Sequence, residues 1–323
     1  MIVAGIDEAG YGPLLGPLVV GCCAFDLGSL SEDEPIPCLW KRLSRLVSKK
    51  RVASGRKLHI NDSKLVYSPS AGLKELERST LAVLCALAEM PVDLAALLEA
   101  TAGHVVEEMP IYPWYQTAGN EVFPLEQDAL SIQLFANALK QEMERANTQC
   151  VYLSARVVLE RRLNQLISAT RNKATVLFST TAIHLDHLLR TYGHGPMTIF
   201  CDRQGGREYY GSLLRLMFDE WSLEVLRQED GYADYCLHRG SNAVRIIFRE
   251  KAETYCMAVA LASMLSKYLR EALMRRFNAF WAGHLPEVAP TAGYYGDGSR
   301  FLRDIELTRR QLGIADEELI RSR

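Results

Sequence analysis

Apolar residues follow two different periods along this chain. Short runs rich in β-branched residues are typical of strands, and they occur at 2–6, 17–25, 150–158, 197–202 and 244–248. Apolar positions at helical spacing predict helices at 71–90, at 131–147, from the end of the third run through about 190, and at about 252–281. Strands that alternate with helices in this way predict an α/β sheet that helices cover on at least one face.

Two parts of the chain depart from this alternation. The stretch 91–135 is interpreted as an insertion between helices. Its residues up to about 130 mix Pro, Tyr, Trp and acids, which is typical of irregular structure. Residues 282–323 are polar with a helical pattern, which predicts a small C-terminal helical extension packed on the main domain.

Composition and cysteine usage restrict the class of protein. The chain has 323 residues, of which 48% are hydrophobic and 24% charged, as expected for a soluble globular protein. No apolar run reaches the roughly 18 residues of a membrane span, and the N-terminus lacks the pattern of a secretory signal, so a cytoplasmic protein is expected. The eight cysteines include no CxxC pair, which favours buried free thiols over a zinc site.

Charge is distributed unevenly. The net charge of −2 argues against nucleic-acid binding through overall charge. From 41 to 57, however, the chain carries eight cationic residues and no acid. Such a run could neutralise several phosphates, or it could simply be a solvated basic surface. The sequence leaves both interpretations open.

Carboxylates stand where predicted strands end. Asp7 and Glu8 follow the first apolar run, Asp202 closes the run 197–202, and Glu253 opens the helix after the run 244–248. Buried acids are costly unless they are paired, hydrogen-bonded or bound to a metal, and carboxylate oxygens suit Mg²⁺ or Mn²⁺. A helix-capping role is the alternative for Glu253. Because neighbours on a strand face opposite ways, Asp7 and Glu8 can share a site only if the first strand ends there.

Several motifs resemble type 2 ribonuclease H, the family of ribonucleases HII and HIII. GIDEAGYGPLLGPLVV at 5–20 resembles the opening motif, in which an Asp-Glu pair precedes a glycine-rich loop. The segment 61–65 (NDSKL) resembles the family's DSK element, and MTIFCD at 197–202 its third carboxylate strand. EKAETYCMAVALASMLSKYLRE at 250–271 resembles the Lys-Ala-acid triplet and its following helix, and TAGYYGDGSRFL at 291–302 resembles the segment with a stacking tyrosine.

This resemblance implies a ribonuclease H-like fold with a central mixed sheet of about five strands, helices on both sides and a C-terminal helical subdomain. It implies a catalytic domain at 1–281, containing the insertion 91–135, and an extension at 282–323. It implies that Asp7, Glu8, Asp202 and Glu253 hold Mg²⁺ or Mn²⁺. It also implies that substrate contacts come from Gly10, Tyr11, Gly12, Asp62, Ser63, Lys64, Ser263, Lys267, Tyr294 and Tyr295.

The expected activity is endonucleolytic hydrolysis of the RNA strand of RNA–DNA hybrids, with no small-molecule cofactor. Two metal ions roughly 4 Å apart can activate water and stabilise the leaving oxygen without a nucleophilic side chain. The glycine-loop amides would sense the 2′-hydroxyl. A structure-specific DNA nuclease and a catalytically silent nucleic-acid-binding protein are the alternatives.

Two departures from the family pattern bear on specificity. Tyr11 stands between the loop glycines where ribonuclease HII has Arg, and a tyrosine cannot pair bidentately with phosphate. Its ring would stack on a base or sugar, or pack under the loop. Glu253 stands where ribonuclease HII usually has Asp and ribonuclease HIII has Glu.

Three further pairs of residues are open to more than one interpretation. Lys267 and Arg270 lie one turn apart on the same predicted helix and could face the substrate or solvent. Arg203 and Arg207 flank two glycines beside Asp202 and could meet phosphate. His184 and His187 have a spacing that could hold a metal, but a structural role is favoured because no third ligand is near in the sequence.

Overall fold

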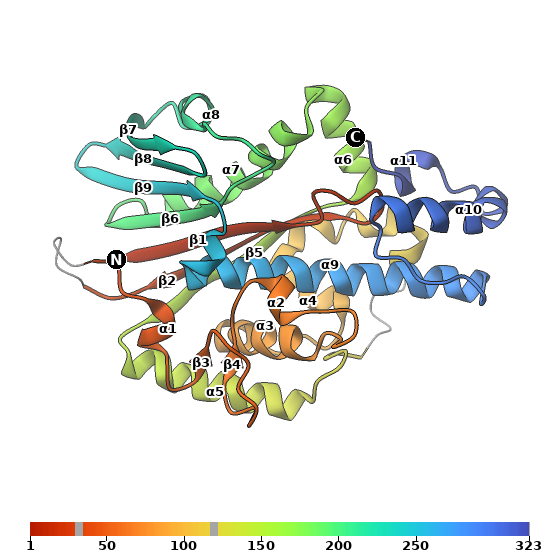
Figure 1. Ribbon diagram of the computed structural model, residues 1–323, viewed down its shortest axis with the longest axis horizontal. Helices are drawn as coiled ribbons and strands as arrows, with labels where there is room; N and C mark the ends of the chain where they lie inside the picture. The colour runs from red at the N-terminus through yellow and green to blue at the C-terminus, as the bar shows by residue number, and fades with distance from the viewer. Residues whose placement is uncertain (30–34, 117–121, 323) are drawn as a thin grey trace.

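A seven-stranded mixed sheet forms the centre of the computed structural model, which describes residues 1–29, 35–116 and 122–322 (Figure 1). The strand order is β5-β2-β1-β6-β9-β8-β7. The strands are β1 (Ile2–Ala9), β2 (Leu18–Asp26), β5 (Gln149–Val158), β6 (Met197–Asp202), β7 (Ser222–Glu229), β8 (Tyr232–Arg239) and β9 (Asn242–Arg249). β6 runs parallel to β1 and β9, and the other neighbouring pairs are antiparallel. The expected α/β class with a mixed sheet is confirmed.

Helices cover both faces of this sheet and bury two separate apolar clusters. One cluster joins one face to α9 (Met257–His284) and to the helices beyond it. The other joins the opposite face to α6 (Glu160–Thr170), α7 (Lys173–Tyr192) and α8 (Gly211–Met217). The remaining helices are α1 (Leu39–Arg42), α2 (Ser63–Val66), α3 (Lys74–Leu87), α4 (Leu94–Ala102), α5 (Ala129–Arg145), α10 (Tyr295–Gln311) and α11 (Asp316–Leu319).

The sheet has two more strands than the expected five or so. β7 and β8 form an antiparallel pair at one edge, and only β8 has the burial of a core strand. β7 is exposed along most of its length, so it lacks the apolar run that reveals a buried strand. A short parallel pair, β3 (Val47–Ser48) with β4 (Leu58–His59), also went unpredicted because two-residue strands carry no period.

Two helical predictions were wrong in detail. The long helix expected through about 190 is divided into α6 and α7, because Arg171 takes a left-handed conformation with φ +52° and Asn172 caps the next helix. The expected irregular insertion contains α4, whose first turn is capped by the Asp93 carboxylate accepting from Ala96 N at 2.7 Å. Residues 117–121 of that insertion lie outside the described residues.

The part of the insertion after residue 121 is anchored by one buried carboxylate. Glu77 of α3 accepts hydrogen bonds from the backbone N–H groups of residues 125–127 at 2.6–2.7 Å. The Tyr268 hydroxyl of α9 donates to the same carboxylate at 2.7 Å. Four donors offset the cost of burying this acid, so the segment is fixed to both α3 and α9.

The C-terminal region is helical as expected, with α10 and α11. The expected domain boundary between 281 and 282 falls inside α9, and Phe301 and Ile305 of α10 belong to the same apolar cluster as α9. The apolar core therefore continues across residue 281, and the division into 1–281 and 282–323 stays a prediction from the sequence.

Two glycines bring α9 close to the sheet. A Cβ atom added to Gly5 of β1 would lie 2.1 Å from Val259 N, and one added to Gly21 of β2 would lie 2.4 Å from Ala262 O. Only hydrogen at these positions lets the helix backbone approach so closely. The first turns of α9 consequently lie directly over β1, at the level of Asp7.

Candidate active site

Asp7 and Glu8 lie where β1 loses one of its two neighbours. Pairing with β6 ends at Ile6, opposite Cys201, whereas pairing with β2 continues through Ala9. The expectation that the strand ends before Asp7 was therefore wrong, since β1 includes both acids. The condition set for a shared site was also wrong, because the charge of Glu8 still raises the pKa of Asp7. Because β6 stops at Asp202, it leaves the edge of β1 unpaired from Asp7 onward.

Asp202 and Glu253 approach the same edge from two further segments. Asp202 is the last residue of β6, and its Oδ1 accepts from Ala252 N at 3.0 Å. Glu253 does not open the long helix as expected, but lies in the 3₁₀ turn η5 (Ala252–Thr254) before it. The turn follows Lys251, whose left-handed φ of +55° reverses the chain after β9. Glu253 is buried.

The four carboxylates influence one another electrostatically. Burial, then the charges of Glu8 and Asp202, raise the pKa of Asp7 well above its usual range. Burial and then Asp202 raise the pKa of Glu8 to about 8. Burial is the main cause that raises the pKa of Glu253 to about 7. Backbone hydrogen bonding opposes this rise, and the charges of Asp202 and Asp62 add to it. Burial also raises the pKa of Asp202, and the amide donors of Ala252 and Arg203 oppose it. These acids are unfavourable as anions without a nearby cation.

The DSK element lies against this group. Asp62 caps α2 by accepting from Lys64 N at 3.0 Å, and the exposed Lys64 ammonium lowers the pKa of Glu8, Asp202 and Glu253, in each case after burial and other larger influences. The Ser263 and Ser63 hydroxyls are 3.0 Å apart, and Ser266 donates to the Asp7 carbonyl oxygen at 3.1 Å. Hydrogen bonding from Ser263 opposes the rise in the pKa of Asp7. Side chains of β1, α2 and α9 thus meet at one place.

The donor set fits a hard divalent cation. All four side chains offer oxygen, and Glu8 Oε2 is buried without a hydrogen-bond partner. Within residues 1–29, 35–116 and 122–322, no three His, Cys, Asp or Glu side chains are gathered closely enough to form a ready metal cage. The four carboxylates lie in one region and act on one another through their charges. A bound cation would have to draw them closer together.

The glycine loop after β1 is held from beneath by one buried arginine. The Arg321 guanidinium is 2% exposed and donates to the carbonyl oxygens of Gly10 at 2.5 Å, Tyr11 at 3.1 Å and Gly16 at 3.3 Å. A planar trans peptide points C=O and the following N–H in opposite directions. The N–H groups of Tyr11 and Gly12 therefore face away from Arg321. No sequence signal marked Arg321, because it lies in none of the motifs.

We expect Arg321→Ala to lower the free energy of unfolding by about 2–4 kcal/mol, since three hydrogen bonds from a charged group are lost inside the protein. Burial lowers the pKa of Arg321 to about 10, so it remains charged at neutral pH. Chemical denaturation measures the effect. Arg310→Ala, which removes a 74%-exposed arginine, is the matched control and should change stability by less than about 1 kcal/mol. Equal losses in both variants would contradict this role.

Tyr11 is partly buried and packs under the loop. Its ring contributes to the apolar cluster on the α7 side, and Lys173 Nζ lies 5.2 Å from the ring centroid. An added Cβ on Gly205 would lie 3.1 Å from the Tyr11 hydroxyl oxygen. Of the two roles considered from sequence, the contacts favour packing over stacking on a substrate.

The remaining residues expected to bind substrate divide into buried and exposed ones. Lys267 pairs with Glu271 at 2.7 Å and lies 4.7 Å over the Tyr67 ring, and Arg270 is buried, donating to Ala292 O at 2.9 Å. Arg270 is therefore not solvated, whereas Lys267 is partly exposed and already paired with an acid. Tyr294 and Tyr295 are both more than half exposed, and Tyr294 lies 5.7 Å from the Arg270 guanidinium carbon.

The histidine pair, Arg203 and the cysteines have structural roles or partners within the protein. His184 is fully buried, its Nε2 lies 3.0 Å from Val20 O, and burial lowers its pKa to about 3, which agrees with a structural role. Arg203 forms ion pairs with Glu250, Glu208 and Asp230, so its charge is already compensated within the protein. All eight cysteines are free, and six of them are buried.

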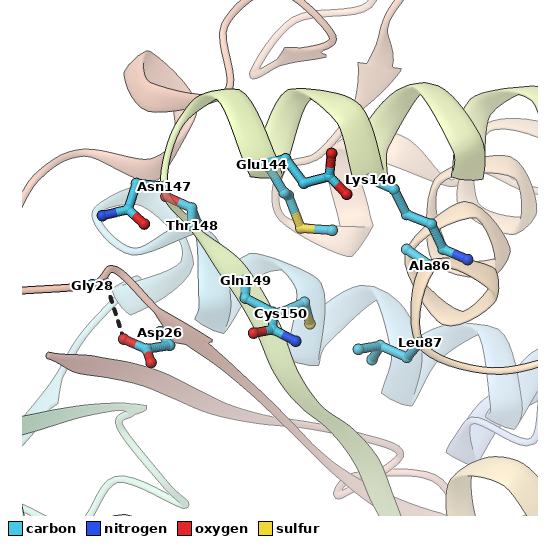
Figure 2. A pocket seen from close by; sticks show the side chains of 11 residues that line it. Asp26, Gly28, Ala86, Leu87, Lys140, Glu144, Asn147, Thr148, Gln149 and Cys150 are labelled. Carbon is cyan, nitrogen blue, oxygen red and sulfur yellow. Dashed lines mark hydrogen bonds between the residues drawn. The ribbon is translucent and has the colours of Figure 1, made fainter.

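A hollow of about 430 Å³ elsewhere on the molecule is not this site. It lies between the start of β5, the end of β2, and helices α3 and α5, and Figure 2 shows Lys140, Glu144 and Asp26 along its wall. The Asp26 carboxylate accepts from Gly28 N at 2.9 Å, which stabilises a turn. None of the four carboxylates described above lines it.

Comparison with known proteins gives a local sequence relationship. Over 87 residues the chain is 32% identical to ribonuclease HII of Gluconobacter oxydans (strain 621H). This local similarity supports the resemblance to the type 2 ribonuclease H family that the sequence motifs indicated. The matched part is 27% of this chain and 41% of the relative, so the chain spans about two fifths of the length of the curated ribonuclease HII that it matches. No family model matches the chain.

Solved structures of type 2 ribonucleases H align along nearly the whole chain at low identity. Ribonuclease HII of Archaeoglobus fulgidus, solved in complex with PCNA, is 15% identical with a TM-score of 0.44, covering 100% of this chain and 95% of that one. Ribonuclease H2 of Pyrococcus horikoshii is 15% identical with a TM-score of 0.46, covering 99% and 92%. Bst ribonuclease HIII with Mn²⁺ is 14% identical with a TM-score of 0.43, covering 99% and 66%. The sheet topology given above was established from the strand pairing of this chain and not from these alignments.

None of the helices within the described residues is long and apolar enough to cross a membrane.

Proposed function

We propose that this protein is a divalent-metal-dependent endonuclease that hydrolyses the RNA strand of RNA–DNA hybrids. The observation that carries the proposal is that Asp7, Glu8, Asp202 and Glu253, from three distant segments, lie close enough for their charges to act on one another. A structural protein gains nothing from gathering four mutually repelling acids, two of them buried, whereas a metal-dependent nuclease needs them. The local similarity to a ribonuclease HII supports the same class of reaction.

Each element of the site has a defined task in this proposal. The four carboxylates would hold Mg²⁺ or Mn²⁺, and two such ions supply an activated water and charge stabilisation on the leaving oxygen. Lys64, already the cation of the carboxylate group, would offset phosphate charge. The outward N–H groups of Tyr11 and Gly12, fixed by Arg321, would meet the ribose 2′-hydroxyl.

The experiment that tests the proposal is cleavage of three labelled duplexes of the same sequence with Mg²⁺ or Mn²⁺. The duplexes are an RNA–DNA hybrid, DNA with one embedded ribonucleotide, and plain DNA. We expect hybrid cleavage that EDTA abolishes. Cutting of the single-ribonucleotide duplex would add the specificity of ribonuclease HII. Cutting of the hybrid but not of the single-ribonucleotide duplex would give the specificity of ribonuclease HIII, in line with Glu253, which stands where that family has Glu.

Two outcomes would contradict the proposal. Cleavage of plain or branched DNA with hybrids spared would make the protein a structure-specific DNA nuclease. Binding without cleavage by either metal would leave a silent nucleic-acid-binding protein.

A further inference from the structure

A basic loop next to the carboxylates has no task in the reaction described so far. This loop, residues 49–57 between β3 and β4, contains Lys49, Lys50, Arg51, Arg56 and Lys57. No acidic residue occurs anywhere from 35 to 61. The sequence left open whether these charges meet phosphate or only water.

The start of the loop is fixed beside the carboxylate group. Since β3 and β4 are parallel, the loop starts at the edge where β4 ends, and Asn61, just after β4, donates from Nδ2 to Lys49 O at 2.9 Å. The Lys49 ammonium lies 4.5 Å over the Trp40 ring and donates to the carbonyl oxygen of Thr254, the neighbour of Glu253. The loop therefore begins in contact with the turn that carries one proposed metal ligand.

The outer cations of the loop are not neutralised by the protein. Lys50 and Arg56 are exposed and make no ion pair with any residue that the structure describes. Arg51, 72% exposed, lies 3.8 Å from Glu75, but Arg78 holds that carboxylate more closely, at 2.6 Å. Lys49 and Lys57, by contrast, donate to backbone carbonyls and build the loop.

The exposed cations of the loop could compensate the phosphate charges of a nucleic acid. A nucleic-acid strand that approaches four carboxylates is repelled until cations compensate its phosphates. The net charge of −2 supplies no general attraction, so compensation must be local. We propose that Lys50, Arg51 and Arg56 bind the phosphate backbone of a nucleic-acid duplex beyond the cleaved bond. This inference rests on the proposed nuclease function and names a second contact surface for the same substrate.

Binding without cleavage tests it. The triple variant Lys50→Gln/Arg51→Gln/Arg56→Gln is compared with the wild-type chain by fluorescence anisotropy on a labelled RNA–DNA hybrid, in EDTA, over a salt series. We expect affinity at 100 mM salt to fall at least about tenfold. The slope of log affinity against log salt should become shallower by about 2–3, because each lost phosphate contact removes roughly 0.9.

A control variant removes the same charge elsewhere. Arg190, Arg227 and Arg239 are exposed arginines on α7, β7 and β8, each paired with an acid. Their triple replacement by Gln changes net charge equally and should leave the salt slope unchanged. Identical slopes for the wild type and the loop variant, while the wild type still cleaves hybrids, would overturn the inference alone. A wild-type chain that neither binds nor cleaves any of the duplexes would overturn the proposed function with it.

Discussion

Asp202→Asn is expected to reduce cleavage of an RNA–DNA hybrid by at least about 100-fold, the loss typical when one preorganised electrostatic group is removed from an active site. Asp202 closes β6 and lies in the field of Glu8 and Asp7. Asparagine keeps an oxygen that can accept from Ala252 N, so the turn before α9 should persist. What it loses is the negative charge that would attract a divalent cation. Single-turnover cleavage at saturating Mg²⁺ or Mn²⁺ measures the effect.

Stability separates this effect from misfolding. The pKa of Asp202 is raised by burial, so its anion is unfavourable in the folded protein, and removing its charge should leave the free energy of unfolding unchanged or higher without metal. Asp186→Asn is the matched control, since it removes a carboxylate from an exposed pair with Arg190 on α7. It should cleave like the wild type. If Asp202→Asn also cleaved at the wild-type rate, Asp202 would not be a metal ligand.

The sequence predicted five strands of the seven-stranded sheet and missed β7 and β8. β6 was predicted with its bounds as they stand, because a parallel strand in the middle of a sheet is one continuous apolar run. β7 was missed because nearly all of its residues are exposed. The break between α6 and α7 was missed as well, since a left-handed arginine at 171 has no apolar signature.

The candidate site was predicted as far as its residues belong to motifs. Asp7, Glu8, Asp202 and Glu253 were named from strand ends and from the family resemblance, and in the structure they lie in one region where their charges act on one another. Their roles stay predictions. Arg321 was not predictable, because it contacts the glycine loop 311 residues earlier in the chain and only the fold makes them neighbours. The short pairing of β3 with β4, which fixes the basic loop, was hidden because strands of two residues carry no period.

Gly5→Ala is expected to lower the free energy of unfolding by at least about 3 kcal/mol, at or above the usual cost of overpacking a core. The added Cβ would lie 2.1 Å from Val259 N and 2.3 Å from Ala258 C, both backbone atoms of α9. β1 cannot retreat, because Gly5 is paired with Cys23 of β2 on one side and with Phe200 of β6 on the other. The helix must therefore shift. Chemical denaturation measures the loss.

The same shift would move α9 away from the carboxylates. Ser266 donates to the Asp7 carbonyl oxygen and Ser263 contacts Ser63, so any Gly5→Ala protein that folds should cleave hybrids poorly. Gly283→Ala, in the last turn of the same helix, is the matched control. An added Cβ there meets no atom within 4 Å, so stability should stay the same or rise by up to about 1 kcal/mol. Wild-type stability and cleavage in Gly5→Ala would mean that α9 does not lie as close to β1 as described, and that Asp7 is positioned by other contacts.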